Sequence, residues 1–330
     1  MKIWHSTYQL SLKGPANSHA KAKFRKGALL RVRFNDKNLI GFADLCPFSE
    51  MGDQPLELEL KHLVQMKPSD IGARSLHFAR IDALARAEGK SVYDSKVRIK
   101  NHFLVNDLMK FETSRLKKIE ADGFSEMKIK LGRDLQIETE RLEQICKQAS
   151  SQLKFRLDFN SSLSRERFVN WFEKHQSWLR PKIEFFEDAF AYDAREWREV
   201  SERWNLTLAM DFVAPEAKLK SEGAAVIIVK PAVEDETRII KSVHNQKKKF
   251  VFTHYMDFPV GQMAAYQAAQ SASAELGERL MSCGLQHHDL YEGLTFQNEI
   301  KSDGPYVLPP EGNGFGFDRL FENLKWVELN

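Results

Sequence analysis

Charged residues recur at one end of several strand-like runs in this chain. In the run MKIKL (127–131), Lys128 and Lys130 are two residues apart. Side chains alternate between the two faces of a strand, so both ammonium groups are expected to point to the same side. Three later runs each carry a carboxylate at or next to their C-terminal end and the following run ends in a lysine, which gives the series Asp158, Glu187, Asp211 and Lys230.

This series predicts a site for a hard divalent cation beside a basic lysine. Carboxylates that converge repel each other, and burying them without partners is costly. A divalent cation relieves the repulsion, and a ligand set without histidine or thiolate favours Mg²⁺ or Mn²⁺ over Zn²⁺. We therefore expect one Mg²⁺ bound by Asp158, Glu187 and Asp211. Flanking lysines that are partly desolvated and close to a cation can have lowered pKa values, so one of them can act as a base near neutral pH.

Each of these residues also has an ordinary structural interpretation. A Lys-x-Lys pair in a strand usually faces solvent, because lysine is rarely buried. An aspartate at the end of a strand is often the N-cap of the next helix, and Asp188 is either such a cap or a competing ligand beside Glu187. Arg156 is interpreted as a structural ion-pair partner. It is the ordered series across successive strands that favours the functional interpretation.

The elements that carry this series alternate between strand-like and helix-like runs. Helix-like stretches such as 137–150 and 261–276 separate eight strand-like segments: 102–105, 127–131, 154–159, 182–187, 206–211, 224–230, 249–255 and 279–285. Such alternation implies a parallel sheet, and eight repeats in so short a span favour a (β/α)₈-type barrel. A doubly wound sheet is the competing interpretation, although the glycine-rich phosphate loop that often opens one is missing. In a barrel, the C-terminal ends of the strands form the active site.

The first hundred residues follow a different, α+β pattern. The segment LLRVRFNDKNLIGFADL (29–45) predicts two strands around a turn at 35–38, and residues 75–89 have the apolar spacing of a helix that ends near Gly89.

Composition excludes several classes of function. Lysine plus arginine exceed aspartate plus glutamate by only 49 − 46 = 3, which gives no reason to expect nucleic acid or an anionic membrane as a partner. The N-terminal segment lacks the apolar core of a signal peptide, and no stretch is apolar enough to span a bilayer. Three widely spaced cysteines, Cys46, Cys146 and Cys283, match no zinc pattern and are expected to be free thiols in the cytoplasm. The oligomeric state stays open, and a monomer is compatible with the sequence.

Lys-x-Lys followed by Asp, Glu, Asp and Lys on successive strands resembles the enolase superfamily, muconate-lactonizing subgroup. RKGALLRVRFNDKNLIGFADLCPFSE (25–50) is similar to the capping-domain segment of these enzymes, and PEGNGFGFD (310–318) to their glycine-rich tail. Within the subgroup, RLDFN (156–160) and VFTHYMDFPVG (251–261) most resemble the o-succinylbenzoate synthase family.

The resemblance implies three parts of the chain and a reaction. Residues 1–98 would form an α+β capping domain, 99–300 the barrel, and 301–330 a tail that returns to the cap. The reaction would be a Mg²⁺-assisted dehydration of a cyclohexadiene carboxylate in menaquinone biosynthesis, by a carbon–oxygen lyase acting through an enediolate.

The resemblance also implies roles for individual residues. Lys130 would be the base, Lys128 would assist electrostatically, and Lys230 would stabilise the anion from the opposite face. The expected substrate contacts are Asn160, Thr253, His254 and Tyr255.

Two alternatives stay open. An N-acylamino acid racemase or dipeptide epimerase of the same subgroup would use Lys130 and Lys230 as bases on the two faces of the α-carbon. A non-catalytic metal-binding barrel is suggested by departures from the family pattern, where Asp188-Ala189 and Phe212 stand in place of the usual neighbours of the second and third ligands.

Overall fold

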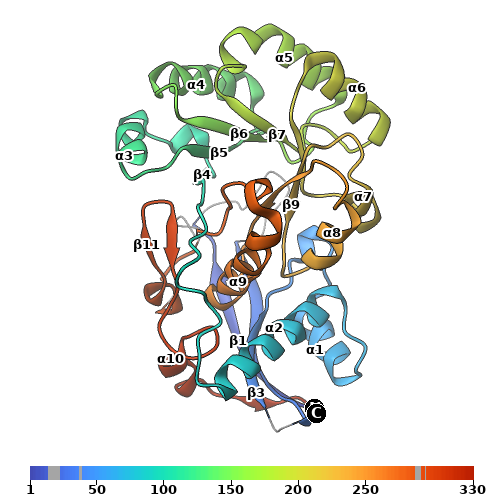
Figure 1. Cartoon of the computed structure of the whole chain (residues 1–330), viewed down its shortest axis with the longest axis vertical. Helices are drawn as coiled ribbons and strands as arrows, with labels where there is room; N and C mark the ends of the chain where they lie inside the picture. The colour runs from blue at the N-terminus through green and yellow to red at the C-terminus, as the bar shows by residue number, and fades with distance from the viewer. Residues whose placement is uncertain (14–22, 37–38, 287–290, 294) are drawn as a thin grey trace.

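The computed structural model describes residues 1–13, 23–36, 39–286, 291–293 and 295–330. Its N-terminal part contains an antiparallel sheet in the order β13-β1-β2-β3, in which the last strand of the chain pairs with the first (Figure 1). The strands are β1 (Lys2–Ser11), β2 (Phe24–Arg33), β3 (Ile40–Leu45) and β13 (Val327–Glu328). Both strands predicted within 29–45 are therefore confirmed, while turn residues 37 and 38 lie outside the described residues.

Helices α1 (Leu56–Val64) and α2 (Asp70–Ala87) follow β3 in the chain and contact this sheet. The predicted helix 75–89 corresponds to α2, which begins earlier because the Ser69 side chain caps it by accepting a hydrogen bond from the Gly72 N–H. α2 packs directly on β3, where a Cβ atom on Gly41 would lie only 2.0 Å from the Ala79 carbonyl oxygen. A glycine is thus required for this close approach.

A parallel sheet in the order β10-β9-β8-β7-β6-β5-β4 forms most of the barrel. Its strands are β4 (Phe103–Val105), β5 (Glu126–Lys130), β6 (Lys154–Asp158), β7 (Ile183–Glu187), β8 (Leu208–Met210), β9 (Val226–Val229) and β10 (Lys249–Phe252). Each corresponds to one of the first seven predicted segments. The expected (β/α)₈-type barrel with an α+β N-terminal part is confirmed.

The prediction of a regular eighth strand at 279–285 was wrong. The segment forms isolated bridges on both sides, Phe250 to Leu280 and Thr253 to Gly284 on one and Asn101 to Cys283 on the other. These bridges close the barrel between β10 and the residues that precede β4. Between these bridges, the Ser282 carbonyl accepts a hydrogen bond from the Arg156 side chain at 2.5 Å instead of joining a ladder.

Helices follow the barrel strands and pack on their outer side (Figure 1). They are α3 (Leu116–Ala121), α4 (Leu135–Gln148), α5 (Arg165–Leu179), α6 (Ala194–Trp204), α7 (Pro215–Lys220), α8 (Glu236–Ser242) and α9 (Pro259–Leu276). Side chains immediately before four of them accept a hydrogen bond from the first turn: Asp134, Ser164, Asp193 and Asp235. The helix-like stretches 137–150 and 261–276 correspond to α4 and α9.

The C-terminal residues return to the N-terminal sheet, and the C-terminus lies beside it in Figure 1. They contain the hairpin β11 (Lys301–Asp303) and β12 (Tyr306–Leu308), followed by α10 (Asp318–Glu322). The buried Asp82 of α2 accepts the N–H groups of Phe42 and Phe315 and pairs with Arg86 at 2.6 Å. This carboxylate therefore joins the tail to the sheet.

None of the helices in the described ranges has the length and apolar sequence needed to cross a membrane. The three cysteines are buried free thiols, as predicted.

Candidate active site

A cavity of about 450 Å³ opens at the C-terminal ends of the barrel strands. Its walls come from β4, β5, β6 and the loops that follow the strands, with a contribution from the N-terminal part of the chain. The predicted site residues that line it are Lys128, Lys130, Asp158, Asn160, Asp211, Lys230, Thr253, His254 and Tyr255. Glu187 lies just behind this wall and is 1% exposed.

The two lysines of β5 face the same cavity, as their spacing predicts. In the parallel register with β6, Lys128 lies beside Arg156 and Lys130 beside Asp158. The Lys128 ammonium contacts Glu187 Oε1 at 2.6 Å and Asp158 Oδ2 at 3.0 Å. One buried cation therefore balances two of the three predicted metal ligands.

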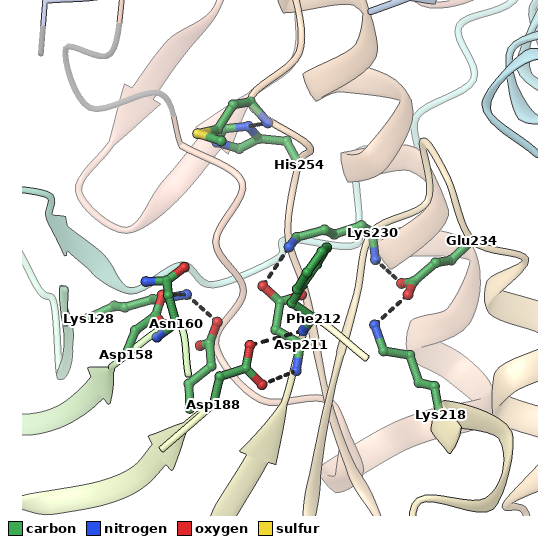
Figure 2. Close-up of polar contacts among 12 residues, drawn as sticks. Lys128, Asp158, Asn160, Asp188, Asp211, Phe212, Lys218, Lys230, Glu234 and His254 are labelled. Atoms are coloured by element: carbon green, nitrogen blue, oxygen red, sulfur yellow. Dashed lines mark hydrogen bonds and ion pairs between the residues drawn. The ribbon is translucent and has the colours of Figure 1, made fainter. Parts of the chain in front are cut away.

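The third carboxylate is paired from the other side of the cavity. Lys230 Nζ lies 2.5 Å from Asp211 Oδ2, and Figure 2 shows Lys128 and Lys230 approaching the acidic side chains from opposite sides. β5 and β9 are four positions apart in a ring of eight segments, so they face each other across the barrel. Lys130 and Lys230 therefore enter the cavity from opposite sides.

Asp188 is neither a helix cap nor free to act as a metal ligand. Its two carboxylate oxygens accept the main-chain N–H groups of Asp211 and Phe212, each at 3.0 Å (Figure 2), and α6 is capped by Asp193 instead. Asp188 is a buried residue with φ +42°. It therefore holds the main chain that carries Asp211 at the end of β8.

Burial and neighbouring charges shift the pKa values of the two β5 lysines in opposite directions. Burial lowers the pKa of Lys130 to about 8, because the attraction of Asp158 is opposed by the positive charges of Lys128 and Lys230. Burial also acts to lower the pKa of Lys128, but Asp158 and Glu187 outweigh it and raise this pKa above its usual range. Lys130 is thus the lysine best suited to lose its proton near neutral pH.

The carboxylates respond in opposite directions. Burial and the nearby Asp158 raise the pKa of Glu187 to about 8. Burial acts to raise the pKa of Asp211 as well, but the cations Lys230, Lys218 and Lys128 lower it to about 2. Asp211 is therefore a permanent anion, whereas Glu187, even with Lys128 beside it, loses its proton readily only when a further cation offsets its acidic neighbours.

If Lys130 is the base, kcat/KM should fall on the acidic side of about pH 8. The reactive form is the neutral amine, so protonation below a pKa of about 8 removes it, with a loss of about tenfold per pH unit. A bound divalent cation would repel the ammonium form and move this limb to lower pH. Steady-state kinetics between pH 5.5 and 9.5 would measure the limb. A pH-independent kcat/KM over that whole range would contradict the assignment.

The carboxylate set fits a hard divalent cation in its chemistry. Within the described ranges, no three acidic, histidine or cysteine side chains are grouped at the spacing of a metal centre. The contacts explain this, since Lys128 holds Glu187 and Asp158 while Lys230 holds Asp211. All available donors are nevertheless carboxylate oxygens, and Asp211 Oδ1 is buried without a hydrogen-bond partner among the described residues. Binding a cation requires the two lysines to give up part of these contacts.

The predicted substrate contacts line the cavity beside this group. Asn160 has φ +47°, and its N–H donates to Asp158 Oδ1 at 3.0 Å. Thr253 has a buried hydroxyl oxygen with no partner among the described residues, so it can hydrogen-bond a substrate. His254 Nδ1 accepts the Met256 N–H at 2.9 Å, which places the ring proton of a neutral His254 on Nε2.

Sequence reasoning missed an arginine that ties the N-terminal part to the cavity wall. The Arg25 guanidinium, 4% exposed, donates to the main-chain carbonyls of Cys46, Tyr255 and Met256 at 2.7, 2.9 and 2.5 Å. It also lies over the Phe48 ring at 4.3 Å. No local pattern in β2 indicates this role, because all three acceptors are main-chain atoms.

His102 also lines the cavity and was missed, although its spacing from Leu104 and Asn106 gave a signal. Residues two apart on one strand share a face, so the reasoning used for Lys128 and Lys130 would have found it. His102 Nδ1 lies 2.9 Å from Arg156 Nη1, and Arg156 Nε pairs with Glu184 at 2.6 Å. The predicted ion-pair role of Arg156 is thus confirmed.

Known proteins match this chain over its whole length. Residues 3–85 match the family of o-succinylbenzoate synthase N-terminal domains, and residues 112–320 match the enolase C-terminal domain-like family. An o-succinylbenzoate synthase of Bdellovibrio bacteriovorus is 35% identical over 330 residues, which cover 100% of this chain and 99% of that protein.

Solved structures share the fold at lower identity. A dipeptide epimerase from Cytophaga hutchinsonii, complexed with Mg and D-Ala-L-Val, has a TM-score of 0.78 at 14% identity, covering 100% of this chain and 99% of that one. An N-succinyl Arg/Lys racemase from Bacillus cereus has the same TM-score, identity and coverage. Full-length identity of 35% to the Bdellovibrio protein and the two family matches decide the assignment. The chain belongs to the o-succinylbenzoate synthase family of the enolase superfamily.

Proposed function

We propose that this protein removes water from a hydroxylated, succinyl-bearing cyclohexadiene carboxylate to give o-succinylbenzoate, as a step of menaquinone biosynthesis. The observation that carries the proposal is the arrangement of Lys130 and Lys230 on opposing strands with three carboxylates between them. The 35% identical relative of the same name supports the choice of substrate.

The residues of the chain divide the reaction between them. Lys130, with its lowered pKa, removes the proton next to the substrate carboxylate. Lys128 stays charged beside Asp158 and Glu187, and Lys230 supplies a second fixed positive charge from the opposite side, so the enediolate forms in a preorganised positive field. The proton now on Lys130 can pass to the departing hydroxyl, which leaves as water while the ring becomes aromatic.

A divalent cation, Mg²⁺ or Mn²⁺, is proposed at Asp158, Glu187 and Asp211. Bound there, it would act as a Lewis acid that neutralises charge on the substrate carboxylate.

Turnover should therefore need the metal. The protein is expected to convert the cyclohexadiene carboxylate in Mg²⁺ buffer, to lose that activity in excess EDTA, and to regain it when Mg²⁺ is restored. Formation of the aromatic product can be followed by ultraviolet absorbance. An active chelated protein would contradict the metal role, and no turnover with Mg²⁺ would contradict the proposed reaction.

Epimerisation of an N-acylamino acid or dipeptide is a second candidate, favoured by the same pair of opposing lysines. It begins with the same proton abstraction, but ends with return of a proton to the other face of the carbon. Incubation with such substrates in D₂O distinguishes the two, because only an epimerase gives stereoinversion with α-deuterium. A non-catalytic barrel would give neither product.

A further inference from the structure

Lys218 is a buried lysine that lies outside the cavity lining. It belongs to α7, and its side chain is only 1% exposed. Lysine is almost never fully buried without a partner, because the desolvated ammonium must be compensated. Its partner is Glu234, whose carboxylate pairs with the Lys218 ammonium (Figure 2). We call these two residues the Lys218–Glu234 pair.

Glu234 connects this pair to the main chain of Lys230. Its second oxygen, Oε2, accepts the Lys230 N–H at 2.7 Å (Figure 2). The Lys230 carbonyl in turn accepts the N–H groups of Val233 and Glu234, both at 3.0 Å. The backbone of Lys230 is therefore fixed on both sides just beyond the end of β9.

The contacts continue from Lys230 into the candidate active site. Its ammonium lies 2.5 Å from Asp211 Oδ2, and the main chain of Asp211 is held in turn by Asp188. A shift of the end of β9 would move the Lys230 ammonium relative to both Asp211 and the substrate. Displacement of a reacting group by about 1 Å can cost on the order of 10²-fold in rate.

Stability alone does not account for the pair. Replacing a buried ion pair by apolar residues of similar size is often neutral or stabilising, since desolvation offsets the attraction between the charges. What apolar residues cannot supply is the oxygen acceptor that Glu234 offers to the Lys230 N–H. We propose that the Lys218–Glu234 pair is a positioning device: Lys218 fixes the Glu234 carboxylate, and Glu234 fixes the main chain of Lys230. This proposal rests on the proposed function, in which Lys230 supplies a fixed charge opposite Lys130.

The test compares two double variants in which no unpaired charge is left buried. Lys218→Met/Glu234→Leu removes the acceptor, whereas Lys218→Met/Glu234→Gln keeps an amide oxygen for the Lys230 N–H. Asp82→Asn/Arg86→Met, which removes the buried pair of the N-terminal part, controls for general loss of stability. Kinetics and hydrogen–deuterium exchange of the segment 226–234 are measured for each.

The Leu variant is expected to lose about 10-fold or more in kcat with KM within about twofold, because a charge needed in the transition state is misplaced. Exchange of 226–234 should accelerate while the other barrel strands keep their protection. The double variant Lys218→Met/Glu234→Gln should retain most of the kcat that the Leu variant loses. The Asp82/Arg86 control should unfold more easily, yet keep the kcat of the folded protein.

Unchanged exchange of 226–234 in the Leu variant would overturn the proposal, and so would an unchanged kcat or a kcat loss that Gln does not relieve. If the wild-type protein shows no dehydration at all, the proposed function fails by itself. The exchange experiment needs no substrate, so in that case it alone decides whether the pair holds Lys230.

Discussion

Lys130→Ala should lower kcat by at least ~10², the lower range for the removal of a general acid–base group. The reason is that Lys130 is the cavity lysine whose pKa is lowered, to about 8, whereas Lys128 is held as a cation by Asp158 and Glu187. Lys128 is held by Glu187 and Lys230 lies across the barrel beside Asp211, so neither is placed to take over this proton abstraction. Single-turnover kinetics with Mg²⁺ would measure the loss in the chemical step directly.

Stability should change little in this variant, because the Lys130 side chain lies in the cavity wall and not among the apolar side chains of the core. Lys147→Ala, on the exposed surface of α4, is a matched control that should keep full activity. Retention of kcat within about threefold in Lys130→Ala would show that another group removes the proton.

Asp211→Asn should weaken Mg²⁺ binding by at least about 10-fold, because it removes one of three anionic ligands from the proposed site. The cations around Asp211 keep its pKa at about 2, so the wild-type residue is charged at every pH of interest. Isothermal calorimetry of Mg²⁺ binding, without substrate, would measure the change. Metal-free protein is expected to keep its circular dichroism spectrum, since the barrel core is formed by apolar side chains.

Asp193→Asn is a suitable control for this experiment. Asp193 caps α6 on the loop that follows β7, and asparagine caps helices about as well as aspartate. An unchanged Mg²⁺ affinity in Asp211→Asn would mean that another residue is the third metal ligand. Asp188 would then have to release its two main-chain N–H groups to serve as that ligand.

The charged series could be predicted from sequence because each member depends on local spacing. Lys128 and Lys130 follow the two-residue period of a strand, and Asp158 and Glu187 end the strands that carry them. Parallel strands bring their C-terminal ends to one edge, so the series converges without knowledge of any particular contact. The same regularity is why the first seven strands were found.

The rest of the site depends on contacts between distant segments. Residues 279–285 have the composition of a strand, but the Arg156 guanidinium occupies the Ser282 carbonyl from more than a hundred residues away. Asp188 could not be assigned because the main-chain N–H groups that donate to it, those of Asp211 and Phe212, lie just beyond the end of the next strand. The Lys218–Glu234 pair could not be predicted from the sequence for the same reason, because β9 separates its two residues along the chain.

The Arg25 contacts have a consequence for how this cavity can change during evolution. Arg25 donates hydrogen bonds to the main-chain carbonyls of Cys46, Tyr255 and Met256. These acceptors are present whatever side chain a residue carries. The position of the main chain in this wall therefore does not depend on which side chains line the cavity there. Exchange of the Met256 side chain could adapt the wall to another ligand, while Arg25 still holds the Met256 carbonyl and keeps the loop in place.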